Sequence, residues 1–385
     1  MICKICGEEN CKEHAILLGK TKNITEFSGS SPPEIFVGRW NYPNVYAGIL
    51  SPPEYGNTEL LSSAEHWHKN KLPIPEILGL RNQLIYGRST TNVHKQSERF
   101  VRVMQEVAMT HKPIAAEFTL KKPVSQNKQQ DTHVPLIAHA APISNVKLQE
   151  NPSIKPKVEY LVNDTSVKAT SALLELEHAS TPTSTLIKLL SAGLLGRHKH
   201  RKLVPTRWSI TAVDDTLSKE KLKRIKFFPE IKEISVFHAQ YLGNHYEFLL
   251  LPDKFAFEVI EITSATNGVW HDYEGFEGRK KYAESVTGAY YTNRLALAEY
   301  LEKIGRQAQC IVFREILPEY NVPLGVGILR QISREAFSHQ PEKFNTKEEA
   351  LLQIQSRNKI PISMYINKSI ILKEFGKQRR LNQFF

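Results

Sequence analysis

Cysteine and histidine crowd the first fourteen residues at spacings that suit a metal ion. Cys3 and Cys6 form a C-x-x-C pair followed by Gly7, four residues separate Cys6 from Cys11, and two separate Cys11 from His14. Three thiolate sulfurs and one imidazole nitrogen make a complete tetrahedral set for Zn²⁺. We therefore predict a structural zinc knuckle; the alternative is unliganded thiols. With histidine as the last ligand, the order differs from that of retroviral knuckles, so nucleic-acid binding is not implied.

The densest polar stretch inside the chain runs from Gly193 to Asp215. Its first half carries two histidines and five positive charges, which suit contacts with phosphates. Arg207 would clamp a phosphate while Trp208 stacks on a base. A solvated basic loop that leads into a buried tryptophan explains the same residues equally well. The candidate nucleic-acid-binding residues are Arg197, Lys199, Arg201, Lys202, Arg207 and Trp208.

Two adjacent carboxylates follow at the end of a predicted strand. Asp214 and Asp215 stand where carboxylates often hold Mg²⁺ for phosphodiester chemistry. Neighbouring side chains on an extended backbone point to opposite faces, however, so both would not reach one ion. The favoured interpretation is that they cap a helix that begins near Leu217.

His245 and Glu247 lie two residues apart on another predicted strand and share a face. A half-exposed polar face is the commoner explanation, and metal binding or acid/base catalysis is the rarer one. A metal-dependent nuclease or nucleotide-processing enzyme that uses Arg207, Asp214, Asp215 and His245 stays open as the second hypothesis. The chain contains no nucleophile elbow, zincin helix or Walker-type phosphate loop.

The last eight residues have the spacing of a docking peptide. Gln378, Leu381 and Phe384 eclipse one another in a tight three-residue turn, and Phe385 lies beside Phe384. Two phenylalanines at a chain terminus favour a partner that buries them, although they could also fold back onto the protein's own core. The pattern Q-x-x-L-x-x-F-F resembles the motif with which repair and replication proteins bind the sliding clamp PCNA.

The spacing of hydrophobic residues predicts the helices and strands that position these candidate site residues. Proline, glycine and aromatic residues between 30 and 55 favour turns and short strands. A long predicted helix carries four candidates for a pocket, which ordinary surface ion pairs explain more simply: Glu284, Tyr291, Arg294 and Glu299. We predict helices over 98–109, 166–178, 182–195, 282–307 and 346–357, strands over 114–120, 208–213, 233–241, 246–251, 255–262, 310–316 and 324–329, and an extended segment over 360–372.

The predicted fold is α+β, with two larger mixed domains that contain antiparallel strands. Residues 251–254 read as a hairpin turn, and the turn-rich stretch near His271 marks the boundary between the two domains. The predicted organisation is a zinc-knuckle segment (1–20), a first domain (21–270), a second domain (271–375) and a flexible clamp-binding tail (376–385).

Bulk properties point toward nucleic acid. The 385 residues include 51 Lys and Arg against 40 Asp and Glu, a net charge of +11. A polyanionic partner, DNA first, is therefore expected. No apolar run approaches the roughly 18 residues of a membrane span, and the N-terminus has no hydrophobic signal segment. We expect a soluble, cytoplasmic, nucleoid-associated protein without disulfides.

Three stretches together resemble one family. They are Ser31-Pro-Pro-Glu-Ile-Phe-Val-Gly-Arg39, the segment from Arg201 to Asp215, and the terminal motif. The chain resembles the archaeal Nre family of DNA repair proteins (NreA type) over nearly its whole length after the knuckle. The resemblance implies PCNA-dependent repair of DNA damage and a link to nucleotide excision repair proteins. The resemblance implies no catalytic residue, and it assigns clamp binding to Gln378, Leu381, Phe384 and Phe385.

Overall fold

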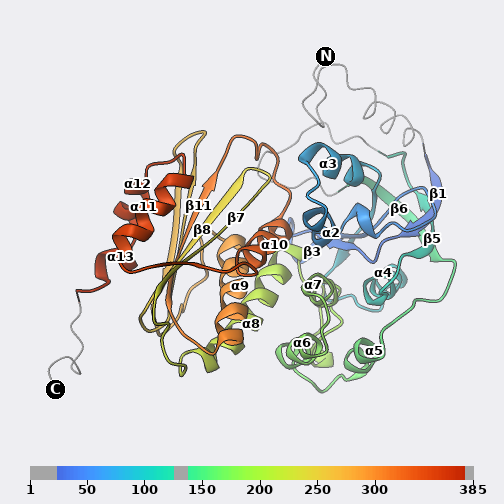
Figure 1. The fold of residues 1–385 in the computed structure, drawn as a ribbon. Coiled ribbons are helices and arrows are strands. Elements are labelled where there is room, and N and C mark those ends of the chain that lie inside the picture. Colours follow the sequence, from blue (N-terminus) through green and yellow to red (C-terminus); the bar gives the residue numbers. More distant parts are fainter. Residues whose placement is uncertain (1–23, 125–137, 378–385) are drawn as a thin grey trace, which may run out of the picture. The chain divides into compact units, whose positions relative to one another are not determined.

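The computed structural model describes residues 24–124 and 138–377, which form two compact units (Figure 1). The N-terminal unit extends to Thr216 and includes Val322–Leu324; the C-terminal unit comprises Leu217–Asn321 and Gly325–Phe385. The division falls within helix α8 (Thr206–Ile225), and the domain boundary expected at residue 270 stays a prediction. Both units contain helices and a sheet, which confirms the mixed α+β class.

The sheet of the N-terminal unit has the strand order β1-β5-β6-β4-β3-β2. Neighbours are antiparallel except β4 and β6, which run parallel. The stretch 30–55 contains strands and no helix, as its composition predicts. The strands are β1 (Glu26–Ser31), β2 (Ile35–Val37), β3 (Asn44–Ser51), β4 (Ile85–Asn92), β5 (Ile114–Leu120) and β6 (His139–Leu148).

Short helices pack around this sheet. In α4 the buried Val101, Met104, Val107 and Ala108 recur at helical spacing, which is why the periodicity predicts this helix correctly. The elements are η1 (Glu59–Leu61), α2 (Ala64–Lys69), α3 (Ile74–Asn82), α4 (Arg99–Met109), α5 (Pro156–Asn163), α6 (Ala169–His178), α7 (Thr183–Ser191), η2 (His198–His200) and the first part of α8.

The sheet of the C-terminal unit has the order β10-β9-β11-β8-β7-β12. Strand β11 lies between β8 and β9, antiparallel to the first and parallel to the second. Residues 251–254 therefore join strands that are not neighbours, and the predicted hairpin there is wrong. The strands are β7 (Ile234–Tyr241), β8 (Asn244–Leu251), β9 (Ala256–Thr263), β10 (Val269–Glu274), β11 (Gln309–Ile316) and β12 (Glu342–Phe344).

Helices cover both faces of this second sheet (Figure 1). On one face the C-terminal helices bury Ile354, Tyr365 and Leu372 against alternate residues of β8, β9 and β11. The capping box of Thr346 and Glu349 starts α11 as the sequence predicts. The helices are α9 (Gly288–Ile304), α10 (Val326–Ala336), α11 (Lys347–Arg357), α12 (Ile362–Lys368), α13 (Ile371–Glu374) and the second part of α8.

Four predicted segments adopt a different structure. Residues 208–213 are helical, because Ser209, Val213, Leu217 and Ile225 form the buried stripe of α8. Residues 324–329 enter α10 after Gly325, whose φ of 93° suits glycine. Residues 360–372 contain α12 and α13 rather than extended chain. The stretch near His271 is strand β10 rather than a turn.

Within the part of the chain that the structure describes, no helix combines the length and the apolar character needed to cross a membrane.

Candidate nucleic-acid interface

Six large aromatic side chains are exposed in the described part of the N-terminal unit, and four of them come from residues 40–46 and from position 208. Trp40, Tyr42, Tyr46 and Trp208 have 71%, 38%, 44% and 45% of their surface accessible. Aromatic rings left in water are costly and mark surfaces that bind partners. We call these four residues the aromatic platform.

Backbone contacts bring the platform together from two distant stretches of sequence. The Val37 N–H donates to Thr206 Oγ1 at 2.9 Å, which fixes the end of β2 beside the first residue of α8. The Gly38 N–H donates to the Tyr46 carbonyl at 2.7 Å. The loop between β2 and β3 therefore lies beside the start of α8, and the Tyr42 and Trp208 rings are 5.2 Å apart.

A cation lies over one face of two of the platform rings. The Arg39 guanidinium lies 4.8 Å from the centroid of Trp40. Arg88 lies 4.1 Å from the centroid of Tyr46, because Tyr46 pairs with Thr90 of β4 and residues two apart on a strand share a face. Each cation thus stands where a phosphate beside a stacked base would be neutralised.

Two more cations come from the polar stretch before and within α8. Lys202 Nζ donates to the Tyr42 hydroxyl at 3.2 Å, and Arg207 is exposed next to Trp208. Among the described residues, no carboxylate forms an ion pair with Arg39, Arg88, Lys202 or Arg207. Their charge is therefore available to a polyanion.

The remaining predicted nucleic-acid residues divide into two kinds. Arg197 and Lys199 flank or lie on η2 and are exposed. Arg201 is partly buried and holds the chain together: its Nε donates to the Gly196 carbonyl at 2.7 Å and its Nη2 to the Asp164 carbonyl at 3.1 Å. Burial lowers the pKa of Arg201, although the Asp164 charge opposes this. Arg201 is thus engaged in structural contacts, unlike its neighbours.

The predicted catalytic residues do not converge within either unit. Asp214 and Asp215 are the ninth and tenth residues of α8, which starts at Thr206, so they lie in the helix interior and do not cap a helix. Asp214 is buried. Both belong to the N-terminal unit, whereas His245 belongs to the C-terminal unit.

His245 and Glu247 share a face, as predicted, but that face is buried rather than half exposed. His245 Nε2 is 2.9 Å from Glu247 Oε1, and Arg357 Nε and Nη2 donate to the two Glu247 oxygens at 2.6 and 2.8 Å. The bidentate pair ties the end of α11 to β8. This geometry indicates a structural role for Glu247.

Sequence reasoning missed two further buried carboxylates on the same face. Glu315 accepts the backbone N–H groups of Lys359 and Ile360 at 3.2 and 2.8 Å. Glu258 accepts those of Ile370 and Ile371 at 2.7 and 3.2 Å. Each carboxylate satisfies backbone donors near the start of a C-terminal helix. The sequence feature that could have identified these carboxylates is the alternation of acidic residues within apolar strands.

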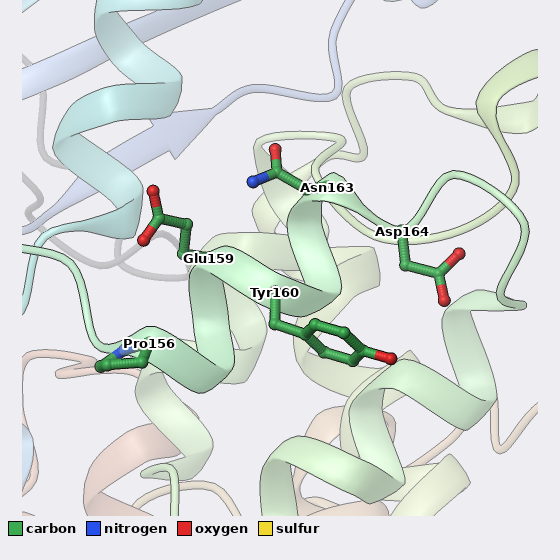
Figure 2. A pocket seen from close by; sticks show the side chains of 5 residues that line it. All are labelled: Pro156, Glu159, Tyr160, Asn163 and Asp164. Atoms are coloured by element: carbon green, nitrogen blue, oxygen red, sulfur yellow. The ribbon is translucent and has the colours of Figure 1, made fainter.

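A shallow hollow on α5 offers no comparable site. Figure 2 shows that its lining side chains, Pro156, Glu159, Tyr160, Asn163 and Asp164, all come from this helix and the residue after it. The Asp164 carboxylate accepts bonds from the Ser166 hydroxyl and backbone at 2.7 and 2.9 Å, and these bonds lower its pKa. The carboxylate is therefore occupied in a turn.

The predicted zinc ligands Cys3, Cys6, Cys11 and His14 and the clamp-binding residues Gln378, Leu381, Phe384 and Phe385 lie outside the described residues. Inside residues 24–124 and 138–377 no three His, Cys, Asp or Glu side chains are grouped so that they could hold a metal ion. Cys310 is buried as a free thiol in β11.

Comparison with known proteins covers nearly the whole chain. The family described as archaeal Nre, N-terminal, matches residues 5–271, and archaeal Nre, C-terminal, matches residues 274–384. The DNA repair protein NreB of Archaeoglobus fulgidus is 36% identical over 388 residues, which cover 99% of this chain and 97% of that protein. The DNA repair protein NreA of Haloferax volcanii is 32% identical over 355 residues, 87% of this chain and 83% of that protein. No solved structure matches the chain. The chain belongs to the archaeal Nre family.

Proposed function

We propose that this protein is a DNA repair factor that holds single-stranded DNA on the aromatic platform and reaches its substrate through a sliding clamp. The relatives are named DNA repair proteins, and the net charge of +11 favours a polyanion. The observation that carries the proposal is the placement of exposed rings beside cations that no described carboxylate neutralises.

Single strands fit this surface better than a duplex. Rings such as Trp40 and Trp208 gain most by stacking on unpaired bases, whose faces are covered in a double helix. Arg39, Arg88 and Lys202 each contact a platform ring, so phosphates on either side of a stacked base would meet a cation. The platform therefore resembles in chemistry the surfaces that bind single strands with little sequence preference.

Measuring DNA affinity at increasing salt concentration tests whether the cations beside the aromatic platform neutralise phosphates. If about four phosphates are neutralised, log K should fall against log salt with a slope of about −3 for single strands, about 50-fold between 50 and 200 mM salt. Fluorescence anisotropy with a labelled single-stranded oligonucleotide measures this slope. A duplex of the same sequence serves as the comparison, and equal or tighter binding of the duplex would contradict the assignment to single strands.

The tail supplies the proposed recruitment. We expect a peptide of the last residues to bind PCNA, with the aliphatic and aromatic side chains in the clamp's hydrophobic groove. Replacing Phe384 and Phe385 together by alanine should abolish binding, since both anchors are lost. Isothermal titration calorimetry measures it, and Asn382→Ala, at a position that the motif leaves free, is the matched control. Unchanged affinity of the double variant would rule out the motif.

The proposal also retains a structural zinc ion held by Cys3, Cys6, Cys11 and His14, which would fold a segment too short to have its own core. Tethering to the clamp would raise the local concentration of the protein at replicating DNA, so that modest affinity suffices. The nuclease alternative would use Arg207, Asp214 and Asp215 of the N-terminal unit and His245 of the C-terminal unit, which the described residues do not bring together within either unit. Mg²⁺ is not part of the proposal.

A further inference from the structure

A cavity in the N-terminal unit lies beside the first family motif. It has a volume of about 260 Å³, and five segments converge on it: the turn before β2, the stretch from η1 to α2, the end of α4, the start of α5 and the start of α7. That volume is below the roughly 300 to 1,000 Å³ of sites for drug-sized ligands. The cavity thus suits one small ring system.

Glu34 is the central polar group of this cavity. Its backbone is fixed, because the Leu50 N–H of β3 donates to the Glu34 carbonyl at 3.1 Å. Its side chain is partly buried, and within the described ranges it makes no hydrogen bond and no ion pair. Burial raises the pKa of Glu34 to about 7, while Lys188 and Arg81 lower it and Glu65 raises it further. A desolvated carboxyl without a partner is the kind of group that binding sites leave for a ligand.

The other lining residues define what would fit. Pro33, Met109, Val158 and Pro182 provide apolar walls, between which a flat ring could lie. Glu59 and Glu65 add two more carboxylates, and Ser62, Ser184 and Thr185 add hydroxyl groups. His111, Lys155 and Lys188 also line the cavity and add donor groups. The polar lining thus suits a ligand whose edge both donates and accepts hydrogen bonds, and Glu34 requires a donor on that edge.

We propose that the Glu34 cavity binds a single nucleobase that carries an amino group. Glu34 would pair with the base edge, accepting from the amino group of adenine, cytosine or guanine, while the apolar walls contact the ring faces. Thymine has no amino group and offers one N–H to a carboxylate. The base could belong to a free nucleoside or to an extruded nucleotide of a DNA strand, and the same contacts serve both. The inference does not depend on the aromatic platform.

Nucleoside titration of the full-length protein tests the proposal. We expect saturable binding of deoxyadenosine, deoxycytidine or deoxyguanosine in protein-observed NMR, and weaker binding of thymidine. Glu34→Ala should weaken binding about 10- to 100-fold, the effect of losing hydrogen bonds to a charged group. Glu117→Ala, which removes an exposed carboxylate of β5, is the matched control. Met109→Trp fills the cavity and leaves Glu34 in place, and it should give the same loss of nucleoside binding. This second variant tests the proposal if Glu34→Ala does not fold.

A second arm distinguishes the source of the base. If Glu34→Ala weakens binding of both nucleosides and a single-stranded oligonucleotide, the base comes from the strand. If only nucleoside binding falls, the ligand is free. The proposal is overturned if none of the amino-bearing nucleosides binds, or if Glu34→Ala and Met109→Trp bind them as well as the unaltered protein does. Platform variants that lose DNA but keep nucleosides would leave it standing.

Discussion

Arg294→Ala is expected to destabilise the C-terminal unit by about 3 to 5 kcal/mol, the effect of leaving one partner of a buried ion pair alone. The Arg294 and Glu274 side chains are each 1% exposed. Arg294 Nη1 donates to both Glu274 oxygens at 3.2 and 3.0 Å, and its Nε donates to Ser218 Oγ at 3.2 Å. Alanine would leave the Glu274 charge without its counterion and open space between α9 and the sheet. Urea unfolding followed by circular dichroism measures the change.

Arg334→Ala is the matched control. Arg334 pairs with Glu299 at 2.6 Å, but both side chains are 30% exposed. Solvent screens that pair, so its loss should cost about 1 kcal/mol or less. Replacing Arg294 by methionine together with Glu274 by leucine should be less destabilising than Arg294→Ala, because no charge stays buried. If Arg294→Ala cost no more than Arg334→Ala, the assigned buried pair would be refuted.

Arg294 and Glu299 also show which features the sequence does not predict. Both Arg294 and Glu299 lie on the long predicted helix, and the sequence predicts surface ion pairs for them. Glu299 makes one, but Arg294 is fully buried. Helical periodicity identifies the faces of a helix, yet α9 is buried over most of its length between the sheet and its helical neighbours. Only the partners that tertiary packing brings to it distinguish the two positions.

The error over residues 208–213 has a related cause. This segment is rich in residue types that favour strands, namely Trp208, Ile210, Thr211 and Val213. Tertiary packing overrides that preference, because a helix here buries a stripe of side chains. Ser209, which belongs to that stripe, and Ser218 are both buried in α8 although they are polar. By contrast, the capping box of α11 was predictable, because both of its bonds are local and need no tertiary partner.

The candidate interface could be predicted only in part. Lys202, Arg207 and Trp208 stand out in the sequence by charge and type, and in the structure Lys202 and Trp208 both contact Tyr42. Arg88 and Tyr46 do not stand out, since their contact depends on the pairing of β3 with β4. The hydrogen bond between Val37 and Thr206 joins residues 169 positions apart in the sequence. No local sequence pattern could therefore predict that the two family stretches lie side by side.

Trp208→Ala and Trp40→Ala should each weaken binding of single-stranded DNA about 5- to 150-fold, since one stacked base contributes about 1 to 3 kcal/mol. Trp208 is the stronger candidate because its ring also supports Tyr42. Anisotropy titrations at constant salt measure the loss. Phe227→Ala is the control, because Phe227 is 89% exposed and belongs to the other unit. A loss as large for Phe227→Ala would mean that the platform is not the binding surface.

Salt dependence separates stacking from charge on the same surface. Trp208→Ala should lower affinity and leave the slope of log K against log salt unchanged, because no phosphate contact is removed. Lys202→Ala should reduce the magnitude of that slope by about 0.7, the contribution of one phosphate on a single strand. A tryptophan variant that changed the slope as much as the lysine variant would indicate that the whole surface had rearranged. Two different responses would instead mean that the rings and the cations make separate contributions to binding of the strand.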